Sequence, residues 1–365
     1  MSNGSTVDTK TVLIPFSFTY SPIKKLALIN IEKDPDQEYI GLEPQVFERS
    51  EYGTAYRVIA YRKDGYVDVY DDLNLQEDDD DCFDVTGKGL CERMKVQMKN
   101  VTFEKRKECF YLSFQFTDKF GREIVAKIFE HTKKRSRGVD LLAPVGSSSE
   151  HPTYLPLFFL YDFDFVRKYQ TEVEVSIDGK AHTPDPFPYP IPKDFQWRYY
   201  TRFSEDCHLI EFANAKETTL QECHIDTNNI VVQDDLIQYT FDEDKNLTKI
   251  SLINQKHHFL VQFKQGFPDI RKLTEKNKYK DTFTLNVDAR MGFISGEYEV
   301  NIVGDEVEIQ LIPTGGWITK PNSFFTKMMF KEKSIFCSWP KTYKYTQKID
   351  LSTLQSVSKW ERTKG

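Results

Sequence analysis

The stretch CFYLSFQFTDKFGREIVAKIFEH, residues 109–131, contains two runs in which apolar side chains recur at every second position. This period of two is typical of β-strands that bury one face. Asp118, Lys119, Phe120 and Gly121 separate the runs and are suited to a tight turn. The stretch therefore predicts an antiparallel β-hairpin.

Similar patterns occur along the rest of the chain. They appear at residues 56–73, 171–180, 228–263 and 296–317, where short alternating runs are separated by Asp, Asn and Gly. Phe, Tyr and Trp make up 14% of the residues, which also favours strands over helices. We expect an all-β protein, with the glycine pair of IPTGGW (312–317) in a turn before a strand.

The tail LSTLQSVSKW, residues 351–360, is the exception to this pattern. Its residues Leu351, Leu354, Val357 and Trp360 recur at intervals of three, which would place them on one side of a helix. We therefore expect a short C-terminal helix.

The length of 365 residues favours two domains over one. HTPDPFPYPIP, residues 182–192, has a proline at every second position from 184 to 192, and such a segment cannot pair as a central strand. We expect an N-terminal β-domain at residues 1–181, a proline-rich connector at 182–194 and a C-terminal β-domain at 195–365. Both domains are expected to be antiparallel barrels or sandwiches.

The net charge of −7 argues against a nucleic-acid partner, because phosphate binding requires a basic surface. The beginning MSNGSTVDTK lacks the features of a signal peptide, and the longest apolar run is far below the roughly 20 residues of a membrane helix. Six scattered cysteines suggest reduced thiols. We expect a cytoplasmic protein without a membrane span, and its oligomeric state stays open.

Two clusters of like charge allow more than one interpretation. QEDDDDCFD at residues 76–84 is expected to form a solvated loop, with calcium binding as the alternative. KKRSR at residues 133–137 fits an ordinary basic surface, and the alternative is an anionic ligand or charged partner.

Common catalytic and cofactor motifs are missing from the sequence. It contains no GxSxG motif, P-loop or GxGxxG motif after a strand, and its cysteines and histidines lack the spacing of a zinc site. We expect no cofactor and no metal.

Asp162 and Asp164 are the first candidates for catalysis. They lie in the apolar run LPLFFLYDFDFVRK, residues 155–168, and on a strand both would point to one face while Tyr161 points to the other. If the pair is buried, one carboxyl becomes a proton donor near neutral pH. The structural alternatives are a solvent-facing pair, an edge strand, or ion pairs with Arg167 or Lys168.

A second group of candidates would bind the ligand. In QWRYYTRFS, residues 196–204, strand alternation places Arg198, Tyr200 and Arg202 on one face, where the arginines could hold a carboxylate or phosphate. Tyr161, Trp197, Tyr199 and Tyr200 are expected to line an aromatic cavity. The alternative is a set of ordinary cross-strand pairs. Two isolated carboxylates, Glu43 and Asp140, are expected in turns or caps, and the alternative is a catalytic role.

The order of hairpins, proline segment and aromatic interior resembles the tandem lipocalin-like proteins. The stretches that carry this resemblance are YDFDFVRK (161–168), SIDGKAHTPDPFP (176–188) and IPTGGW (312–317). This group includes carotenoid hydratases of the hydroxyneurosporene synthase type, AttH-like proteins and some fungal natural-product cyclases. The resemblance covers the whole chain as architecture and implies two lipocalin-like domains that hold an apolar small molecule. It does not imply a particular reaction.

These observations lead to one main hypothesis and three alternatives. The main hypothesis is a cofactor-independent cyclase, hydratase or isomerase that binds a hydrophobic or amphipathic metabolite and uses acid–base catalysis. The alternatives are a small-molecule binding protein without catalysis, a carbohydrate-active β-sandwich, and a purely structural protein.

Overall fold

The computed structural model describes most of the chain as β-strands. The described residues are 11–21, 23–49, 53–76, 87–106, 109–131, 138–188, 197–225, 228–233, 236–253, 255–274, 278–286, 290–321 and 324–363. The acidic run at residues 77–84, the basic cluster at 133–137 and the second half of the proline segment lie outside them. Among the described residues, no helix is long and apolar enough to cross a membrane.

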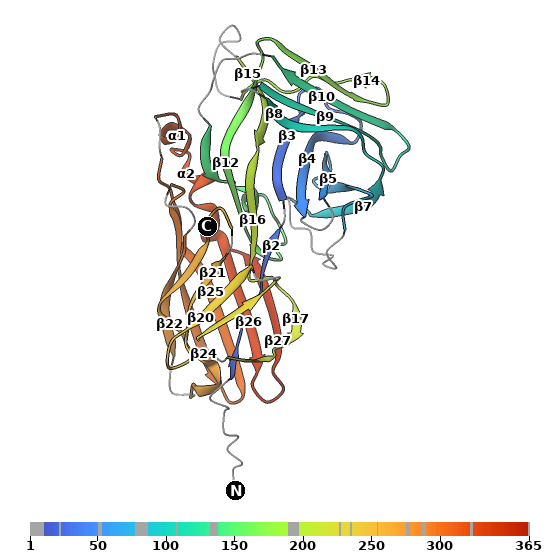
Figure 1. Cartoon of the computed structure of the whole chain (residues 1–365). Helices are drawn as coiled ribbons and strands as arrows, with labels where there is room; N and C mark the ends of the chain where they lie inside the picture. The colour runs from blue at the N-terminus through green and yellow to red at the C-terminus, as the bar shows by residue number, and fades with distance from the viewer. Residues whose placement is uncertain are drawn as a thin grey trace. The chain divides into compact units, whose positions relative to one another are not determined.

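The chain forms two compact units that interleave in sequence (Figure 1). Unit 1 takes residues 1–20, 151–157 and 210–365, and unit 2 takes residues 21–150 and 158–209. The domain boundaries predicted from the sequence, at residues 181 and 195, do not coincide with the boundaries of these units. Residues 182–188 belong to unit 2, where buried Asp185 accepts hydrogen bonds from the backbone of Glu32 and Lys33 at 3.2 and 3.0 Å.

Unit 2 is built from two packed sheets. One sheet has the order β14-β13-β10-β9-β8, and the strands β12-β15-β3-β4-β5-β6-β7 lie side by side in the other. All these pairs are antiparallel except β6 with β7. The strands are β3 (Ile23–Asn30), β4 (Tyr39–Arg49), β5 (Gly53–Arg62), β6 (Val67–Asp72), β7 (Leu90–Val96), β8 (Lys99–Arg106), β9 (Cys109–Thr117), β10 (Glu123–Glu130), β11 (Val139–Leu142), β12 (Leu155–Arg167), β13 (Thr171–Ile177), β14 (Lys180–Ala181) and β15 (Arg198–Ser204), with a 3-10 helix η1 (Val145–Ser147).

The core of unit 2 fills the space between these sheets. Phe110 stacks on Phe203 from the opposite sheet, with ring centroids 4.0 Å apart, and Tyr70 contacts Phe116 at 4.8 Å. Each of these rings is at most 4% exposed. One face of each sheet is therefore committed to the core, and the opposite face of β3, β4, β5 and β15 is left to carry polar side chains.

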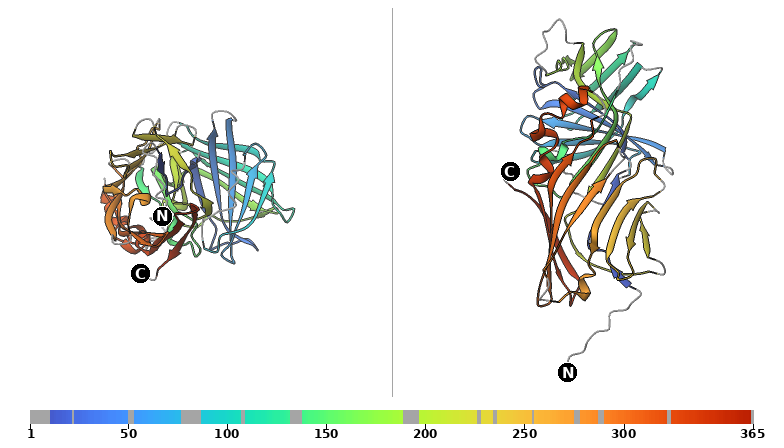
Figure 2. Two further views of the ribbon diagram at one scale, coloured as in Figure 1. Left: turned by 90° about the horizontal axis from the view of Figure 1, so that it is seen from below. Right: turned by 90° about the vertical axis from the view of Figure 1, so that its left-hand side faces the viewer.

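Unit 1 is dominated by a ten-stranded antiparallel sheet that curves strongly (Figures 1 and 2). Its order is β17-β27-β26-β25-β24-β23-β22-β21-β20-β19, and β1 pairs separately with β18. The elements are β1 (Thr11–Leu13), β2 (Phe18–Ser21), β16 (Asp206–Phe212), β17 (Glu217–Thr219), β18 (Glu222–His224), β19 (Asn229–Val232), β20 (Ile237–Phe241), β21 (Leu247–Leu252), β22 (Leu260–Phe267), β23 (Tyr279–Asn286), β24 (Phe293–Val303), β25 (Glu306–Ile318), β26 (Tyr343–Asp350) and β27 (Gln355–Arg362), with 3-10 helices η3 (Ile270–Lys272) and η4 (Trp339–Thr342) and helices α1 (Phe324–Met329) and α2 (Lys333–Phe336).

The all-β prediction is confirmed, and the local hairpin predictions agree with the strands. The turns expected at Asp64-Gly65, Asp118–Gly121 and Asp178-Gly179 connect β5 to β6, β9 to β10 and β13 to β14. Gly65, Gly121 and Gly179 all have positive φ, which these turns require. Within the described residues, no sheet closes into a barrel.

Two local predictions were wrong. The expected C-terminal helix is instead the strand β27, in which Ser356 and Trp360 are buried and Val357 is exposed. Alternation and pairing with β26 outweigh the three-residue spacing in this tail. The glycine pair Gly315-Gly316 is not a turn but lies within β25, beside a register shift against β24.

Candidate functional site

Asp162 and Asp164 do not form a buried pair. Asp162 is exposed in β12, while Tyr161, Phe163 and Phe165 are buried, so the predicted alternation is present. The Asp164 carboxylate is 2.8 Å from the guanidinium of Arg198, and both side chains are partly buried. Asp164 is thus held by an ion pair, with Arg198 in place of the expected Arg167 or Lys168, and the enclosed acid pair on which the first hypothesis depends is not present.

The backbone explains why Asp162 is turned outward. Its φ of 49° lies in the left-handed region, which Asp tolerates better than β-branched residues. The pairing of β11 with β12 shifts register nearby, and the Asp162 N–H donates to the carboxylate of Asp140 at 3.1 Å. Asp140 therefore has a structural role at a β-bulge.

The expected aromatic lining is dispersed. Trp197 is 70% exposed, Tyr161 is 2% exposed, and Tyr199 is half-buried against the core between the sheets of unit 2. These three side chains therefore do not line one common cavity. Tyr200 differs, because its ring lies beneath the guanidinium of Arg202, 4.4 Å from the ring centroid.

A polar cluster occupies the face of β3, β4, β5 and β15 that points away from the core of unit 2. We call it the Glu43 cluster; its members are Asn30, Glu43, Gln45, Tyr61 and Arg202. Strand pairing brings them together, because β3 lies between β4 and β15, β5 pairs with β4, and Glu43 and Gln45 are two residues apart on β4. The sequence-based expectation that Glu43 caps a turn is wrong, since it lies in the middle of a strand.

Glu43 is at the centre of the cluster. It is only 6% exposed. The Tyr61 hydroxyl donates to its Oε2 at 2.6 Å, and the Gln45 side-chain amide donates to its Oε1 at 2.8 Å. Burial raises the pKa of the Glu43 carboxyl, although the bonds from Tyr61 and Gln45 and the charge of Arg202 act in the opposite direction. The direction of this shift favours the protonated carboxyl, which is the form that can donate a proton.

Arg202 provides the positive charge of the cluster. Its Nη2 donates to Oδ1 of buried Asn30 at 2.9 Å. Its Nε is buried and, among the described residues, has no hydrogen-bond partner. Buried guanidinium N–H groups are normally paired, so this Nε is an unsatisfied donor within the described part of the chain.

Aromatic rings adjoin Arg202. Phe165 stacks on Tyr200 with ring centroids 6.3 Å apart, and Phe187 meets Phe165 edge-on at 4.8 Å. Tyr200, Tyr61 and Arg202 are half-buried. The face therefore combines a positive group, a buried acid and apolar ring surface.

Cys207 lies near the cluster but is not a suitable nucleophile. It is fully buried, and burial, followed by the charges of Asp206 and Glu43, raises the pKa of its thiol well above the ordinary value. The thiolate is the reactive form of cysteine, and its formation at Cys207 is disfavoured.

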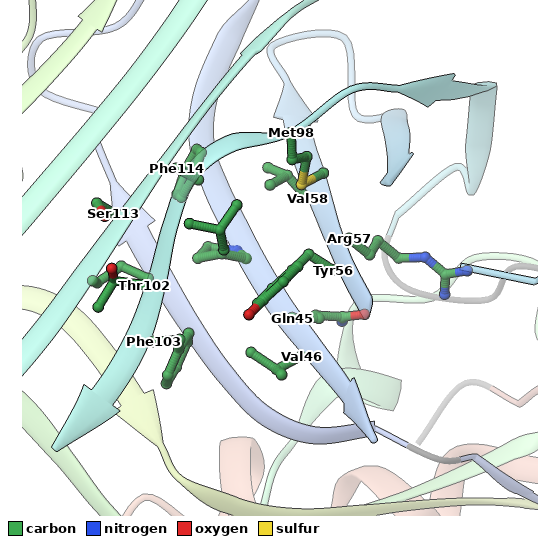
Figure 3. A pocket seen from close by; sticks show the side chains of 13 residues that line it. Gln45, Val46, Tyr56, Arg57, Val58, Met98, Thr102, Phe103, Ser113 and Phe114 are labelled. Atoms are coloured by element: carbon green, nitrogen blue, oxygen red, sulfur yellow. The ribbon is translucent and has the colours of Figure 1, made fainter. Parts of the chain in front are cut away.

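Figure 3 shows a separate pocket on the core side of unit 2, between β4 and β5 on one sheet and β8 and β9 on the other. Its walls include Val46, Tyr56, Met98, Phe103 and Phe114. The cavity volume is about 10 Å³, which is room for about one water molecule. This pocket is too small for a metabolite.

Comparisons of the chain with protein-family models, with curated proteins and with solved structures find no match. The sequence indicates Arg202 and Tyr200 as neighbours on one face, and strand pairing confirms this. The sequence makes Glu43 only a weak candidate, with a turn or cap preferred, and it does not predict Gln45, Tyr61 or Asn30. The signal was the alternation of Glu43 and Gln45 with Leu42 and Val46 in YIGLEPQVF, residues 39–47, which places two polar side chains on one strand face.

Proposed function

We propose that unit 2 binds a small amphipathic anion at the Glu43 cluster and transfers a proton to it from Glu43. The observation that carries this proposal is the proximity of a buried acid with a raised pKa to an arginine whose buried Nε has no partner among the described residues. The reaction class is cofactor-independent protonation, as in an isomerisation, hydration or cyclisation.

Each residue has a definite role in this proposal. Arg202 binds the carboxylate or phosphate of the ligand through its Nε. Tyr200 and Phe165 contact the apolar part, and Tyr61 and Gln45 orient the Glu43 carboxyl. The resemblance to tandem lipocalin-like proteins belongs to the same proposal, because that group binds apolar molecules.

Ligand binding can be tested with the fluorescent probe 1-anilinonaphthalene-8-sulfonate, an aromatic anion. We expect Arg202→Gln to weaken its binding about tenfold or more, since a hydrogen bond to a charged group contributes roughly 1.5–3 kcal/mol. The matched control is Arg106→Gln, at an exposed arginine of the same unit. Equal affinity of Arg202→Gln and wild type would refute binding at this cluster.

Proton transfer needs a second readout. Native mass spectrometry of the purified protein identifies a bound molecule, which is then returned to the protein in D₂O. We expect wild type to incorporate deuterium into the molecule and Glu43→Gln to bind it without incorporation. Incorporation by both proteins would exclude Glu43 as the proton donor.

One observation favours a second function, binding without catalysis. Both carboxyl oxygens of Glu43 already accept hydrogen bonds from Tyr61 and Gln45, which suits a structural acid as well as a reactive one. Probe binding that depends on Arg202, with no deuterium incorporation by wild type, would identify this function.

A further inference from the structure

The segment 318–341 of unit 1 forms a cap that contains α1 and α2. It is anchored from its inner side: the Phe330 ring contacts the rings of Trp317 and Phe336, with centroids 5.0 and 5.6 Å apart, and the backbone N–H of Trp317 donates to the Cys337 carbonyl at 2.8 Å. Trp317 and Phe330 are buried. These contacts fix one side of the cap, and other residues of the cap remain exposed.

Four large apolar side chains are exposed on the cap. Phe324 is 81% exposed, Ile335 49%, Ile318 45% and Met328 38%. Phe324 and Met328 are four residues apart on α1, so they lie on the same side of the helix. Exposed apolar side chains gathered in one segment indicate a binding surface rather than scattered surface residues.

The same segment is strongly basic. Its lysines are Lys320, Lys327, Lys331, Lys333 and Lys341, and its only acidic residue is Glu332, which gives a net charge of +4 in a chain whose total is −7. All five lysines are exposed. No ion pair involving them occurs in the part of the chain that the structure describes. Lys333 and Lys341 both act electrostatically on the Cys337 thiol, so these two charges lie on neighbouring parts of the cap.

We propose that the cap binds the surface of an anionic lipid bilayer. Phe324, Met328, Ile335 and Ile318 insert into the boundary between head groups and acyl chains, and the lysines contact the anionic head groups. Lysine side chains next to inserted apolar residues can extend toward the head groups. The inference concerns unit 1 and is independent of the function proposed for unit 2.

A bilayer fits these observations better than an acidic protein does. The apolar side chains project outward, with Phe324 only one-fifth buried, and a protein partner would have to supply a separate pocket for each. A bilayer accepts projecting side chains without complementary pockets. Each inserted residue also lies close in sequence to a lysine, as in Lys327-Met328 and Lys333-Ser334-Ile335.

The test uses the full chain and sedimentation with two kinds of vesicle, phosphatidylcholine alone and phosphatidylcholine mixed with phosphatidylserine. We expect binding to the mixed vesicles, weakening as salt is added, and little binding to phosphatidylcholine. Lys327→Gln with Lys333→Gln should lower the partition coefficient about 25-fold, since each lysine near an anionic surface contributes about 1 kcal/mol, or about fivefold. Phe324→Ser with Ile335→Ser should reduce binding to the mixed vesicles without making it more sensitive to salt.

The matched controls lie elsewhere in unit 1. Val303→Ser replaces an exposed apolar residue (79% exposed) and Lys249→Gln an exposed lysine, and both should bind the mixed vesicles like wild type. The proposal is overturned if wild type does not bind these vesicles at low salt, or if the control variants lose as much binding as the cap variants. Binding to soluble polyglutamate but not to vesicles would point to an acidic protein partner and would also overturn it.

Discussion

Glu43 is buried in the middle of β4 by residues that sheet pairing brings to it from other strands. Its position in the sequence, directly before Pro44 among apolar residues, is compatible with a turn. Its burial and hydrogen bonds depend on Tyr61 from the next strand and on the charge of Arg202 from a strand far along the chain. Such partners cannot be inferred from local spacing, because they are set by sheet pairing. Arg202 and Tyr200 were predictable as neighbours because they are two residues apart on one strand.

The raised pKa of Glu43 predicts a specific dependence of stability on pH. A carboxyl whose pKa is higher in the folded than in the unfolded state stabilises the fold below its ordinary value of 4.5, and this contribution is lost as pH rises through the folded-state pKa. Because Gln cannot ionise, the stability of Glu43→Gln relative to wild type should increase as pH rises above 4.5 and should level off once pH exceeds the folded-state pKa. Thermal unfolding at a series of pH values measures this difference, and a difference that is the same at every pH would contradict the raised pKa.

At the scale of elements, hairpins were predictable and irregular strands were not. The turns at Asp64-Gly65 and Asp178-Gly179 are encoded by adjacent residues with positive-φ preference. The register shift in β12 at Asp162 depends on the close approach of β11, and that at Gly296 in β24 depends on contact with β25. Residues 355–362 form a strand because they pair with β26. The spacing of apolar residues in this tail does not predict that pairing.

The bulge in β12 provides the test at this scale. A Cβ atom added at Gly138 would lie 2.6 Å from the backbone carbon atoms of Asp162, which is too close for two non-bonded carbon atoms, so one strand must move. We expect Gly138→Ala to lower the free energy of unfolding by about 1–3 kcal/mol. Gly41→Ala is the control, because the nearest atom to its added Cβ lies 3.3 Å away. Urea unfolding measures the free energy of unfolding of both variants. An equal decrease in the two would show that the contact with β12 does not destabilise Gly138→Ala.

At the scale of the molecule, each of the two units is formed by segments that lie far apart in the sequence. Phe16, fully buried in unit 1, contacts Phe267 at 4.9 Å and Tyr345 at 6.2 Å, and the Gln347 amide donates to the Pro15 carbonyl at 2.9 Å. Composition and length were sufficient to predict two β-rich parts. The interleaving was not predictable, because no local signal marks which distant strand Phe16 packs against.

This arrangement predicts how fragments behave. Residues 195–365 lack Phe16, and removing a buried phenylalanine ring costs about 3–5 kcal/mol, a large part of the stability of a typical domain. The isolated fragment should therefore melt non-cooperatively when followed by circular dichroism. The same fragment with residues 11–20 and 151–157, the two other segments of unit 1, attached through glycine–serine linkers should regain cooperativity. A sharp transition of the bare fragment at the Tm of the full chain would refute this prediction.

The interleaved units also bear on biosynthesis. A ribosome releases residues 11–20 before any strand that they contact in unit 1, and the Pro15–Gln347 contact spans 332 positions. Unit 2 has all its residues once position 209 has emerged, and it can fold while translation continues. Phe16 then lacks its contact with Tyr345 until β26 is synthesised. We therefore expect a chaperone to bind the N-terminal segment of the nascent chain. Slow translation would increase the time during which this segment lacks its contacts in unit 1.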